Sequence, residues 1–380
     1  MMGQYSMTMT SKTAATTSMK SGGYYSESTR GAKDVIDNAS GMLMDAIAAL
    51  PEPSTDRALN IADFGAADGG TSKKSIRASV AAMRSKFPDR QIVVTYTDLA
   101  SNDFSTLFKS MQGLEGNDEN TYYKEFDGVF VHACGIGFHN QLMPDRSLDL
   151  GFSATAMHYI SEKPCEIPDH VHMVGTSGAT LEAYAARAAK DWENILLARS
   201  NELAPGGRLV FMNFGKDEQG RYLGGTGGAD MFDTFDMLWK QLATEGKISE
   251  AEYINASFSQ FYRTKEEFSA PLVDTSSAVY SSGLRLISAH TGVVGCPYRA
   301  AFDQSNGAMS AREFAVSYIP TLRSWSETVF ANALDASRPN DERLAIVDLF
   351  YQRYEDLVAE NPDGHAMDYV HCYLAIEKIS

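Results

Sequence analysis

Short runs of apolar and β-branched residues, bounded by Gly, Pro, Asp or Asn, recur through the first half of the chain. These runs are "ALNIADFG", "RQIVVTYTDL", "FDGVFVHACG", "SLDLGFS" and "GRLVFMNFG". Their length and composition predict buried strands. The segments "TSKKSIRASVAAMRSKF" and "LEAYAARAAKDWENILLARSNELAPGG" between them place apolar residues at helical spacing. Strands that alternate with helices predict an α/β fold with a parallel sheet and right-handed crossovers.

The pattern changes after residue 215. "MFDTFDMLWKQLATEGKISEAEY" predicts a helix with one apolar face, and residues 310–335 and 340–360 have helical periodicity, whereas "GLRLISAHTGVVG" and "DYVHCYLAIEK" predict strands. We therefore expect a disordered tail over 1–23, an α/β core over 24–215, a helical cap insertion over 216–282, a returning core strand within 283–304, a second cap segment over 305–360 and a final core strand within 361–380.

The N-terminal segment, residues 1–23, is rich in Ser, Thr and Met and contains no acidic residue. This composition is similar to that of an organelle transit peptide, but the segment lacks the arginine residues that are typical of such peptides. We therefore interpret the segment as a disordered tail.

Acidic residues outnumber basic ones, 49 against 33, which gives a formal net charge of −16. The chain has no run of Lys or Arg that could follow a phosphate backbone, so neither nucleic acid nor an anionic membrane is an expected partner. No apolar run approaches the roughly 20 residues that span a bilayer.

The four cysteines, Cys134, Cys165, Cys296 and Cys372, are scattered without a CxxC pair. This usage predicts neither a disulfide framework nor a zinc site, and it favours the reducing cytoplasm.

A glycine-rich turn, "NIADFGAADGG", joins the first predicted strand to the following helix. Glycines at such a turn let a ligand approach the backbone. The GxGxxG pattern of dinucleotide-binding proteins is absent, and the first acid that ends the next strand, Asp98, lies 33 residues after Gly65. This arrangement suits S-adenosylmethionine, with Asp63 and the turn at its methionine part and Asp98 at its ribose. The alternative is an ordinary turn whose glycines only permit tight packing.

Five segments in the same order resemble the SABATH family of S-adenosylmethionine-dependent methyltransferases. They are "GGYYSEST", "IADFGAADGG", "TDLASNDFSTLF", "GIGFHNQLMPDRSLDLGFSATAMHYISEKP" and "KDWENILLARSNELAPGGRLVFMNFG". The resemblance implies a doubly wound, Rossmann-like class I methyltransferase sheet with a mostly helical cap, and a homodimer. Members of this family methylate carboxyl groups of small acids and, in some cases, ring nitrogens.

The resemblance also implies which residues contact the cofactor. These are Tyr25, Ser28, Asp63, Gly65, Asp98, Leu99, Gly137 and Phe138, with Ser153 and Thr155 near the sulfonium.

Two positions that hold the substrate carboxylate in the family differ in this chain. The family glutamine falls at Ala32 and the tryptophan at Tyr159, whereas the neighbouring histidine is kept as His158. We expect His158 and Tyr159 to orient the acceptor, with Arg30 as a further donor. Alternatively the acceptor group is not a carboxylate, His158 is a hydrogen-bonded core histidine and Tyr159 packs in the pocket wall.

Apolar residues of the strands and the cap are further candidates for a substrate pocket, although most are expected to be core. They are Met157, Phe211, Met212, Trp239, Phe258, Phe261 and Tyr262. Their abundance favours a flat or aromatic acid. "DHVHM" gathers Asp169, His170 and His172, but no spaced third ligand group accompanies them, so we expect no metal.

A carboxylic acid with a pKa near about 4 is ionised at neutral pH and needs no general base, so positioning is enough for methyl transfer. The sequence therefore predicts an S-adenosylmethionine-dependent O-methyltransferase that forms the methyl ester of a small acid. Two alternatives remain: an enzyme of the same fold that methylates nitrogen or sulfur of a small metabolite, and a non-catalytic cofactor-binding protein.

Overall fold

The structure is a computed structural model that describes residues 30–53, 57–114 and 120–379. The predicted tail, with Tyr25 and Ser28, lies outside the described residues.

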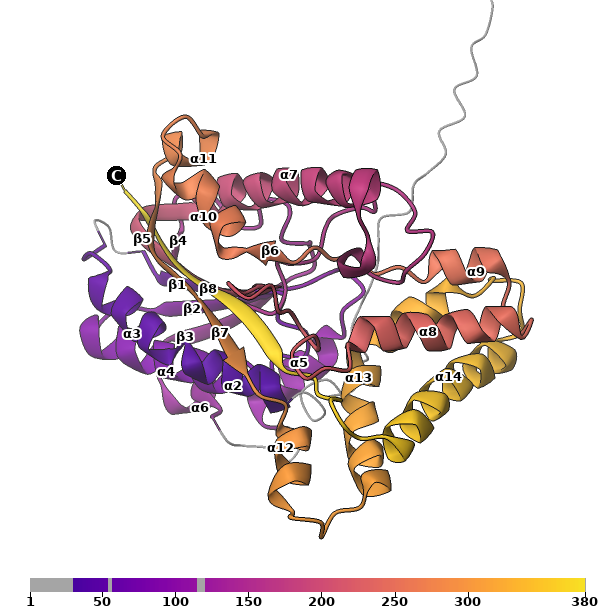
Figure 1. Ribbon diagram of the computed structural model, residues 1–380. Coiled ribbons are helices and arrows are strands. Elements are labelled where there is room, and N and C mark those ends of the chain that lie inside the picture. The colour runs from indigo at the N-terminus through magenta and orange to yellow at the C-terminus, as the bar shows by residue number, and fades with distance from the viewer. Residues whose placement is uncertain (1–29, 54–56, 115–119, 380) are drawn as a thin grey trace, which may run out of the picture.

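A mixed sheet with the strand order β3-β2-β1-β4-β5-β8-β7 forms the centre of the molecule, and β6 pairs with the end of β5 (Figure 1). The first five strands run parallel, whereas β8 is antiparallel to both of its neighbours. The strands are β1 (Leu59–Phe64), β2 (Ile92–Thr97), β3 (Val129–Cys134), β4 (Leu148–Ala154), β5 (Leu203–Lys216), β6 (Arg263–Thr264), β7 (Leu284–Val294) and β8 (Tyr369–Lys378). The predicted strands and the α/β fold are confirmed.

Helices cover both faces of this sheet (Figure 1). The helices α7 (Gly178–Glu202), α10 (Lys265–Val273) and α11 (Ala278–Ser281) lie on one side. The other side carries α2 (Arg30–Asn38), α3 (Ser40–Ala49), α4 (Lys73–Lys86), α5 (Phe104–Gln112) and α6 (Tyr122–Glu125). The central strands are buried on both faces, so their sequences are continuous apolar runs. These runs are the feature from which the strands were predicted.

A second group of helices lies beside one end of the sheet (Figure 1). It consists of α8 (Met231–Thr244), α9 (Glu250–Asn255), α13 (Ala311–Ala333) and α14 (Asn340–Glu360), and the short helix α12 (Pro297–Gln304) leads into α13. The aromatic rings of Phe235, Trp239, Phe330 and Phe350 pack together between them. The helices α10 and α11 belong to the segment predicted as a cap insertion, yet they pack against α7 and β7. None of the described helices has both the length and the apolar character needed to cross a membrane.

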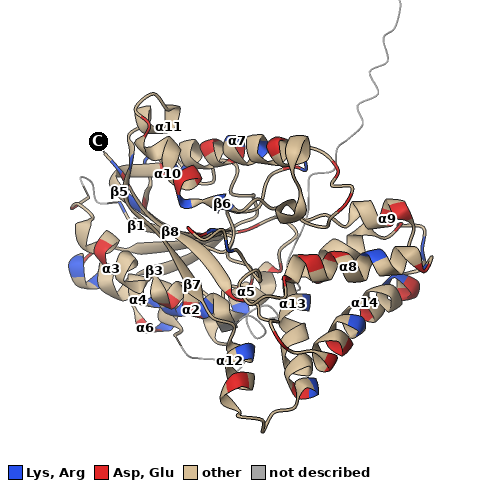
Figure 2. Ribbon diagram, viewed as in Figure 1, with Lys and Arg blue, Asp and Glu red and all other residues tan. Residues whose placement is uncertain are grey.

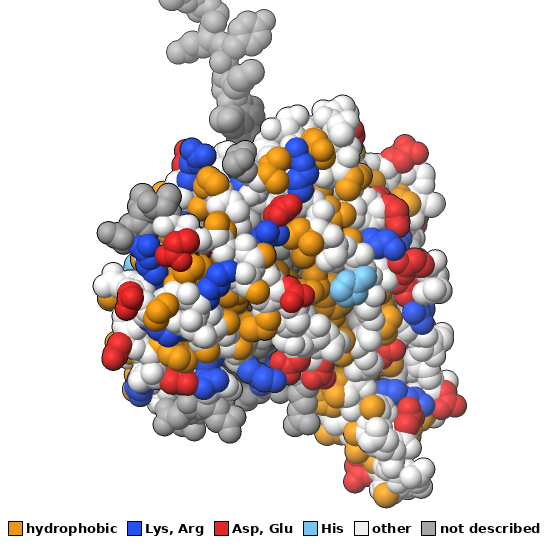
Figure 3. Space-filling view, turned by 90° about the vertical axis from the view of Figure 1, so that its left-hand side faces the viewer, with side chains coloured by type: hydrophobic (Ala, Val, Ile, Leu, Met, Phe, Trp, Pro, Cys, Tyr) orange, Lys and Arg blue, Asp and Glu red, His pale blue; other side chains and the backbone are white. Residues whose placement is uncertain are grey.

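Charged side chains of both signs are interspersed over the outer helices, whereas the strands carry few of them (Figure 2). The face shown in Figure 3 likewise places basic and acidic side chains next to one another, with apolar side chains between them. This face therefore offers no continuous basic surface, in agreement with the net charge of −16.

The connection between β3 and β4, residues 135–147, contains no helix and is held by a buried ion pair from the end of α7. The guanidinium of Arg199 contacts the carboxylate of Glu202 at 2.6 Å, and both side chains are completely buried. Arg199 also donates to the carbonyl oxygens of Phe138 at 2.8 Å and Asn140 at 2.6 Å. Glu202 accepts from the backbone N–H groups of Leu142 and Met143 in the same connection. The pair thus replaces the backbone partners that a helix would have supplied.

Replacing Glu202 with Gln should destabilise the fold by about 3–5 kcal/mol, because it leaves the buried Arg199 without its counter-charge. Chemical denaturation measures this change. The matched control is Glu193→Gln on the same helix, whose pair with Lys190 is partly exposed and should be worth less than about 1 kcal/mol. Equal stability losses for the two variants would contradict the structural role of the buried pair.

Candidate active site

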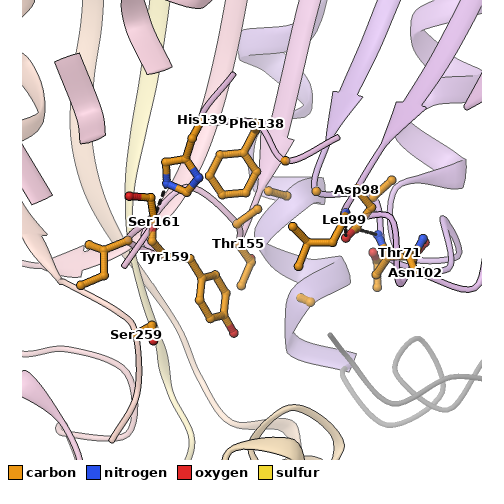
Figure 4. A pocket seen from close by; sticks show the side chains of 18 of the residues that line it. Thr71, Asp98, Leu99, Asn102, Phe138, His139, Thr155, Tyr159, Ser161 and Ser259 are labelled. Carbon is orange, nitrogen blue, oxygen red and sulfur yellow. Dashed lines mark hydrogen bonds between the residues drawn. The ribbon is translucent and has the colours of Figure 1, made fainter. Parts of the chain in front are cut away.

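A cavity of about 340 Å³ lies where β1, β2 and β4 end (Figure 4). It is lined by the turn after β1, the residues after β2, the connection between β3 and β4, the segment after β4, and α2. The sequence-predicted residues that line it are Ala32, Gly65, Asp98, Leu99, Gly137, Phe138, Thr155 and Tyr159. The fold therefore brings together residues from both the predicted cofactor site and the predicted substrate site.

The glycine turn forms one wall of the cavity. Gly65 has a φ of +80°, and Ala67 has a φ of +49°. The N–H groups of Gly65 and Ala66 donate to the carbonyl oxygen of Thr97 at 2.9 Å and 3.0 Å, which ties the turn to the end of β2. A Cβ atom at Gly65 would lie 2.4 Å from the Cβ of Ala156. This position therefore requires glycine both for its backbone conformation and for the close approach of the segment after β4.

Asp98 is fixed by two backbone donors. The N–H of Ala67 donates to one carboxylate oxygen at 2.7 Å, and the N–H of Leu99 donates to the other at 2.7 Å (Figure 4). Burial raises the pKa of Asp98, and the two backbone hydrogen bonds oppose that rise. Each oxygen keeps a further lone pair, so the carboxylate can also accept the two hydroxyls of a ribose.

Asp63 and Ser153 do not line the cavity. Asp63 is buried behind the turn, where it accepts a hydrogen bond from the hydroxyl of Ser72 at 2.5 Å. Burial raises the pKa of Asp63 to about 7, and the bond from Ser72 opposes this rise. The hydroxyl of Ser153 donates to the carbonyl oxygen of Phe64 at 2.8 Å. Both residues support the end of β1 from behind.

Tyr159 and His158 have different positions relative to the cavity. The ring of Tyr159 lies in it, and the carbonyl oxygen of Tyr159 contacts His139 Nε2 at 3.2 Å (Figure 4). Burial raises the pKa of Tyr159 to about 12, and an interaction with the Gln260 side chain opposes this rise. His158 is buried behind Tyr159, with the two ring centroids 4.6 Å apart. Burial lowers the pKa of His158 well below its ordinary value, so this histidine is neutral.

Four other predicted substrate residues are placed elsewhere or are not described. Met212 is buried in β5, where its carbonyl oxygen accepts the N–H of Thr155 at 2.7 Å. Trp239 lies in the core of the helical group, and Phe261 packs in a cluster beneath α7. The side chain of Arg30, the first residue of α2, lies outside the described residues.

The histidines of "DHVHM" have structural partners. His170 contacts the carbonyl oxygen of His172 at 2.8 Å and a carboxylate oxygen of Asp233 at 3.1 Å. His172 stacks on Phe232 with ring centroids 4.0 Å apart. Within the described ranges, no group of three His, Cys, Asp or Glu side chains could hold a metal ion.

Several lining residues were not identified from the sequence: Thr71, Asn102, His139, Asn140 and Ser259. Asn102 donates to the carbonyl oxygen of Ala67 at 2.8 Å and so supports the turn that holds Asp98. His139 and Asn140 directly follow Phe138, so proximity to a predicted site residue was the available signal. Ser259 has no such signal, because it reaches the site from a distant loop.

Comparison with known proteins gives matches over most of the chain. The family model described as SAM dependent carboxyl methyltransferase matches residues 15–378. Gibberellic acid methyltransferase 1 of Arabidopsis thaliana is 25% identical over 237 residues, which cover 56% of this chain and 61% of that protein. A probable 7-methylxanthine methyltransferase 5 of Theobroma cacao is 28% identical over 228 residues, which cover 55% of this chain and 59% of that protein.

The match thus spans about three fifths of the length of these two relatives. Among solved structures, loganic acid methyltransferase with SAH superposes with a TM-score of 0.72 at 20% identity, and the match covers 95% of this chain and 99% of that one. This similarity shows that the two proteins share their fold.

Replacing Asp98 with Ala should weaken binding of S-adenosylhomocysteine by about 2 kcal/mol or more, because two hydrogen bonds to a charged group are lost. Titration calorimetry measures the affinity without turnover. Asp45→Ala, at an exposed position of α3, is the control and should leave the affinity unchanged. An unchanged affinity for Asp98→Ala would remove Asp98 from the cofactor site.

Proposed function

This chain belongs to the family of S-adenosylmethionine-dependent carboxyl methyltransferases, and we propose that it forms the methyl ester of a small, flat or aromatic carboxylic acid. The single observation that carries this proposal is the match of the family model over residues 15–378. The position of Asp98, at the end of β2 and in the wall of the cavity, agrees with it.

The residues around the cavity fit the cofactor of this family, S-adenosylmethionine. When bound, this cofactor supplies an electrophilic methyl group on a sulfonium. We assign the ribose to Asp98, whose two oxygens are already held in place by backbone N–H groups. The turn with Gly65, which leaves no room for a Cβ, would lie along the methionine part, and Leu99 and Phe138 provide apolar surface for the base.

The chain's own residues position the acceptor and need not remove a proton from it. An ionised carboxylate already has a nucleophilic oxygen. His139 and His158 are kept neutral, because burial lowers the pKa of each. The apolar side chains of Ala32, Ile36 and Ile160 limit access of water to the cavity. We infer that these residues align the carboxylate and exclude solvent, which is the work that methyl transfer to an anion requires.

The hydroxyl of Tyr159 is the first candidate to hold the acceptor. This hydroxyl lies near the side chain of Gln260, and it can donate its hydrogen to a ligand in the cavity. The ring of His158 packs behind it and fixes its orientation. The lining of the cavity contains neither Lys nor Arg among the described residues, so neutral donors would have to hold the carboxylate.

A second candidate is methylation of nitrogen on a small metabolite. Two observations favour it: Ala32, where the family has a glutamine that holds the carboxylate, and a relative whose name states that it acts on 7-methylxanthine. A third candidate, a cofactor-binding protein without turnover, requires a cavity that admits no acceptor.

We also propose that the protein is a homodimer in the cytoplasm. The homodimer rests on the family resemblance. The cytoplasmic location rests on the scattered cysteines, all four of which are free thiols. Light scattering of the purified protein tests the first statement, and fractionation of cells tests the second.

A panel of acceptors with methyl-labelled cofactor tests the proposed function. It contains benzoic, gibberellic and loganic acids, 7-methylxanthine, and simple amines and thioethers. An ester product supports the carboxyl assignment. A methylated amine or a sulfonium product, or no product at all, contradicts it.

The pH dependence separates the carboxylate from an amine as acceptor. Because His139 and His158 both have lowered pKa values, neither should titrate between pH 6.5 and 8.5. Asp63, buried behind the turn, has a pKa raised to about 7, so the test is made above about pH 8, where this carboxyl is largely ionised. There kcat/KM for an acid should be flat, whereas a rate that still rises with pH would indicate an acceptor that must lose a proton.

Replacing Tyr159 with Phe should lower kcat/KM for the acid, with a loss of transition-state stabilisation of about 1.5–3 kcal/mol. The substitution removes one hydrogen-bond donor to an anion and keeps the ring. Cofactor affinity should hardly change. Tyr123→Phe, at an exposed position of α6, is the control. Ala32→Gln restores the donor of the family and should either raise turnover of benzoate or abolish it by filling the cavity. An unaltered turnover in Tyr159→Phe would exclude this hydroxyl as a donor.

A further inference from the structure

Thr155 has a strained backbone in the wall of the cavity. Its φ is +58°, in the left-handed region that β-branched residues avoid. Such a conformation is energetically unfavourable and persists only where the surroundings impose it. Thr155 is the only β-branched residue among the described non-glycine residues with positive φ. The strain therefore occurs at a residue that a ligand in the cavity would contact.

Two hydrogen bonds hold Thr155 in this conformation. Its N–H donates to the carbonyl oxygen of Met212 at 2.7 Å. Its hydroxyl lies 3.0 Å from Nε2 of His371, a residue 216 positions further along the chain, on β8. The second bond is the one that fixes the side chain, and it depends on a strand that does not otherwise line the cavity.

His371 is completely buried and neutral. Its ring packs on Phe214 with centroids 4.4 Å apart. Burial lowers the pKa of His371 to about 3, so the ring carries a single N–H at physiological pH. The other nitrogen, Nδ1, has no hydrogen-bond partner among the described residues.

The position of that single hydrogen determines what Thr155 can do. If it were on Nδ1, a buried N–H donor would be left unpaired, which is rarer in proteins than an unpaired acceptor. With the hydrogen on Nε2, His371 donates to the hydroxyl oxygen of Thr155. The hydroxyl hydrogen of Thr155 is then free, and within the described part of the chain no other acceptor contacts it.

We propose that this hydroxyl of Thr155 donates to the acceptor carboxylate, and that His371 is a positioning residue that acts through Thr155. This inference rests on the proposed function. Thr155 and Tyr159 both follow β4 and both line the cavity, so their hydroxyls provide two neutral donors. Since Ala32 cannot donate and no lining Lys or Arg is present among the described residues, the oxygen that is not methylated must take its hydrogen bonds from neutral groups such as this hydroxyl.

The opposing possibility is that the Thr155–His371 bond only ties the end of β4 to β8. Two conservative pairs of variants separate the two roles. Thr155→Ser keeps the hydroxyl, whereas Thr155→Val keeps the branched shape without it. His371→Gln keeps an N–H donor, whereas His371→Phe removes it.

The wild-type acceptor panel is measured first, and it decides the proposed function before any variant is made. With the best acid of that panel, Thr155→Val should lower kcat/KM on the order of 10- to 100-fold, as expected for one hydrogen bond to a charged group. Thr155→Ser should stay within about threefold, since it keeps that bond. The proposal assigns the Thr155 hydroxyl to the acceptor and not to the cofactor near which the resemblance placed it. The affinity for S-adenosylhomocysteine, measured by calorimetry, should therefore be the same in both variants.

The double variant Thr155→Val/His371→Phe tests whether His371 acts through Thr155. Its kcat/KM should be no lower than that of Thr155→Val alone, because the hydroxyl that His371 holds is already absent. His371→Gln should recover most of the activity that His371→Phe loses. If His371→Phe does not fold, the Thr155 pair and His371→Gln still decide the matter.

Three results would overturn the proposal while esters are still formed by the wild type. They are equal losses in Thr155→Val and Thr155→Ser, additive losses in the double variant, and a loss confined to cofactor affinity. If the wild type forms no ester from any acid, the proposed function itself has failed, and that outcome is separate from these three.

Discussion

The buried contact between Arg199 and Glu202 is the constraint on which the shape of the site depends. It joins the last turn of α7 to the connection between β3 and β4, which has no helix to supply its backbone with hydrogen-bond partners. That connection carries Gly137, Phe138 and His139 into the wall of the cavity. Removing a charged pair from water costs free energy. Here this cost is offset because nearly every hydrogen-bonding atom of the pair has a partner. The least regular part of the cavity wall is therefore held in place by this buried pair.

The part of the cavity wall next to this connection is formed by Thr155, whose backbone is strained, and by Tyr159 with the aromatic rings behind it. His158 and Phe214 pack there with ring centroids 4.9 Å apart, and both are buried. Their neutral rings place a low-dielectric layer behind the hydroxyl groups. In such surroundings a hydrogen bond to an anion is stronger than in water, which compensates in part for the acidic surface of the protein.

The parallel core was predictable from sequence because its strands are buried on both faces and therefore appear as apolar runs between turn residues. The cofactor side of the cavity followed from the glycine turn and Asp98, since these residues are close to recognisable strand ends. Arg199 and Glu202 lie in a segment that resembles the family, but their buried pairing could not be predicted, because an Arg and a Glu three positions apart on a helix have the same spacing as the partly exposed Lys190 and Glu193. His371 gave no signal either, because its contact with Thr155 depends on how β8 pairs with β5.

The place of β8 in the sheet has a consequence for biosynthesis. Of the described elements β8 leaves the ribosome last, yet it lies between β5 and β7, and among the described strands β7 pairs only with β8. The growing chain can form β1 to β5 with their helices. β7, however, can pair only after β8 has been synthesised, and β8 follows α12, α13 and α14 in the chain. Contacts between such distant segments form slowly, because a long loop must be closed first. Nascent chains therefore expose the edge of β5 throughout the synthesis of residues 217–368, a period in which chaperones that bind unpaired strands would be of use.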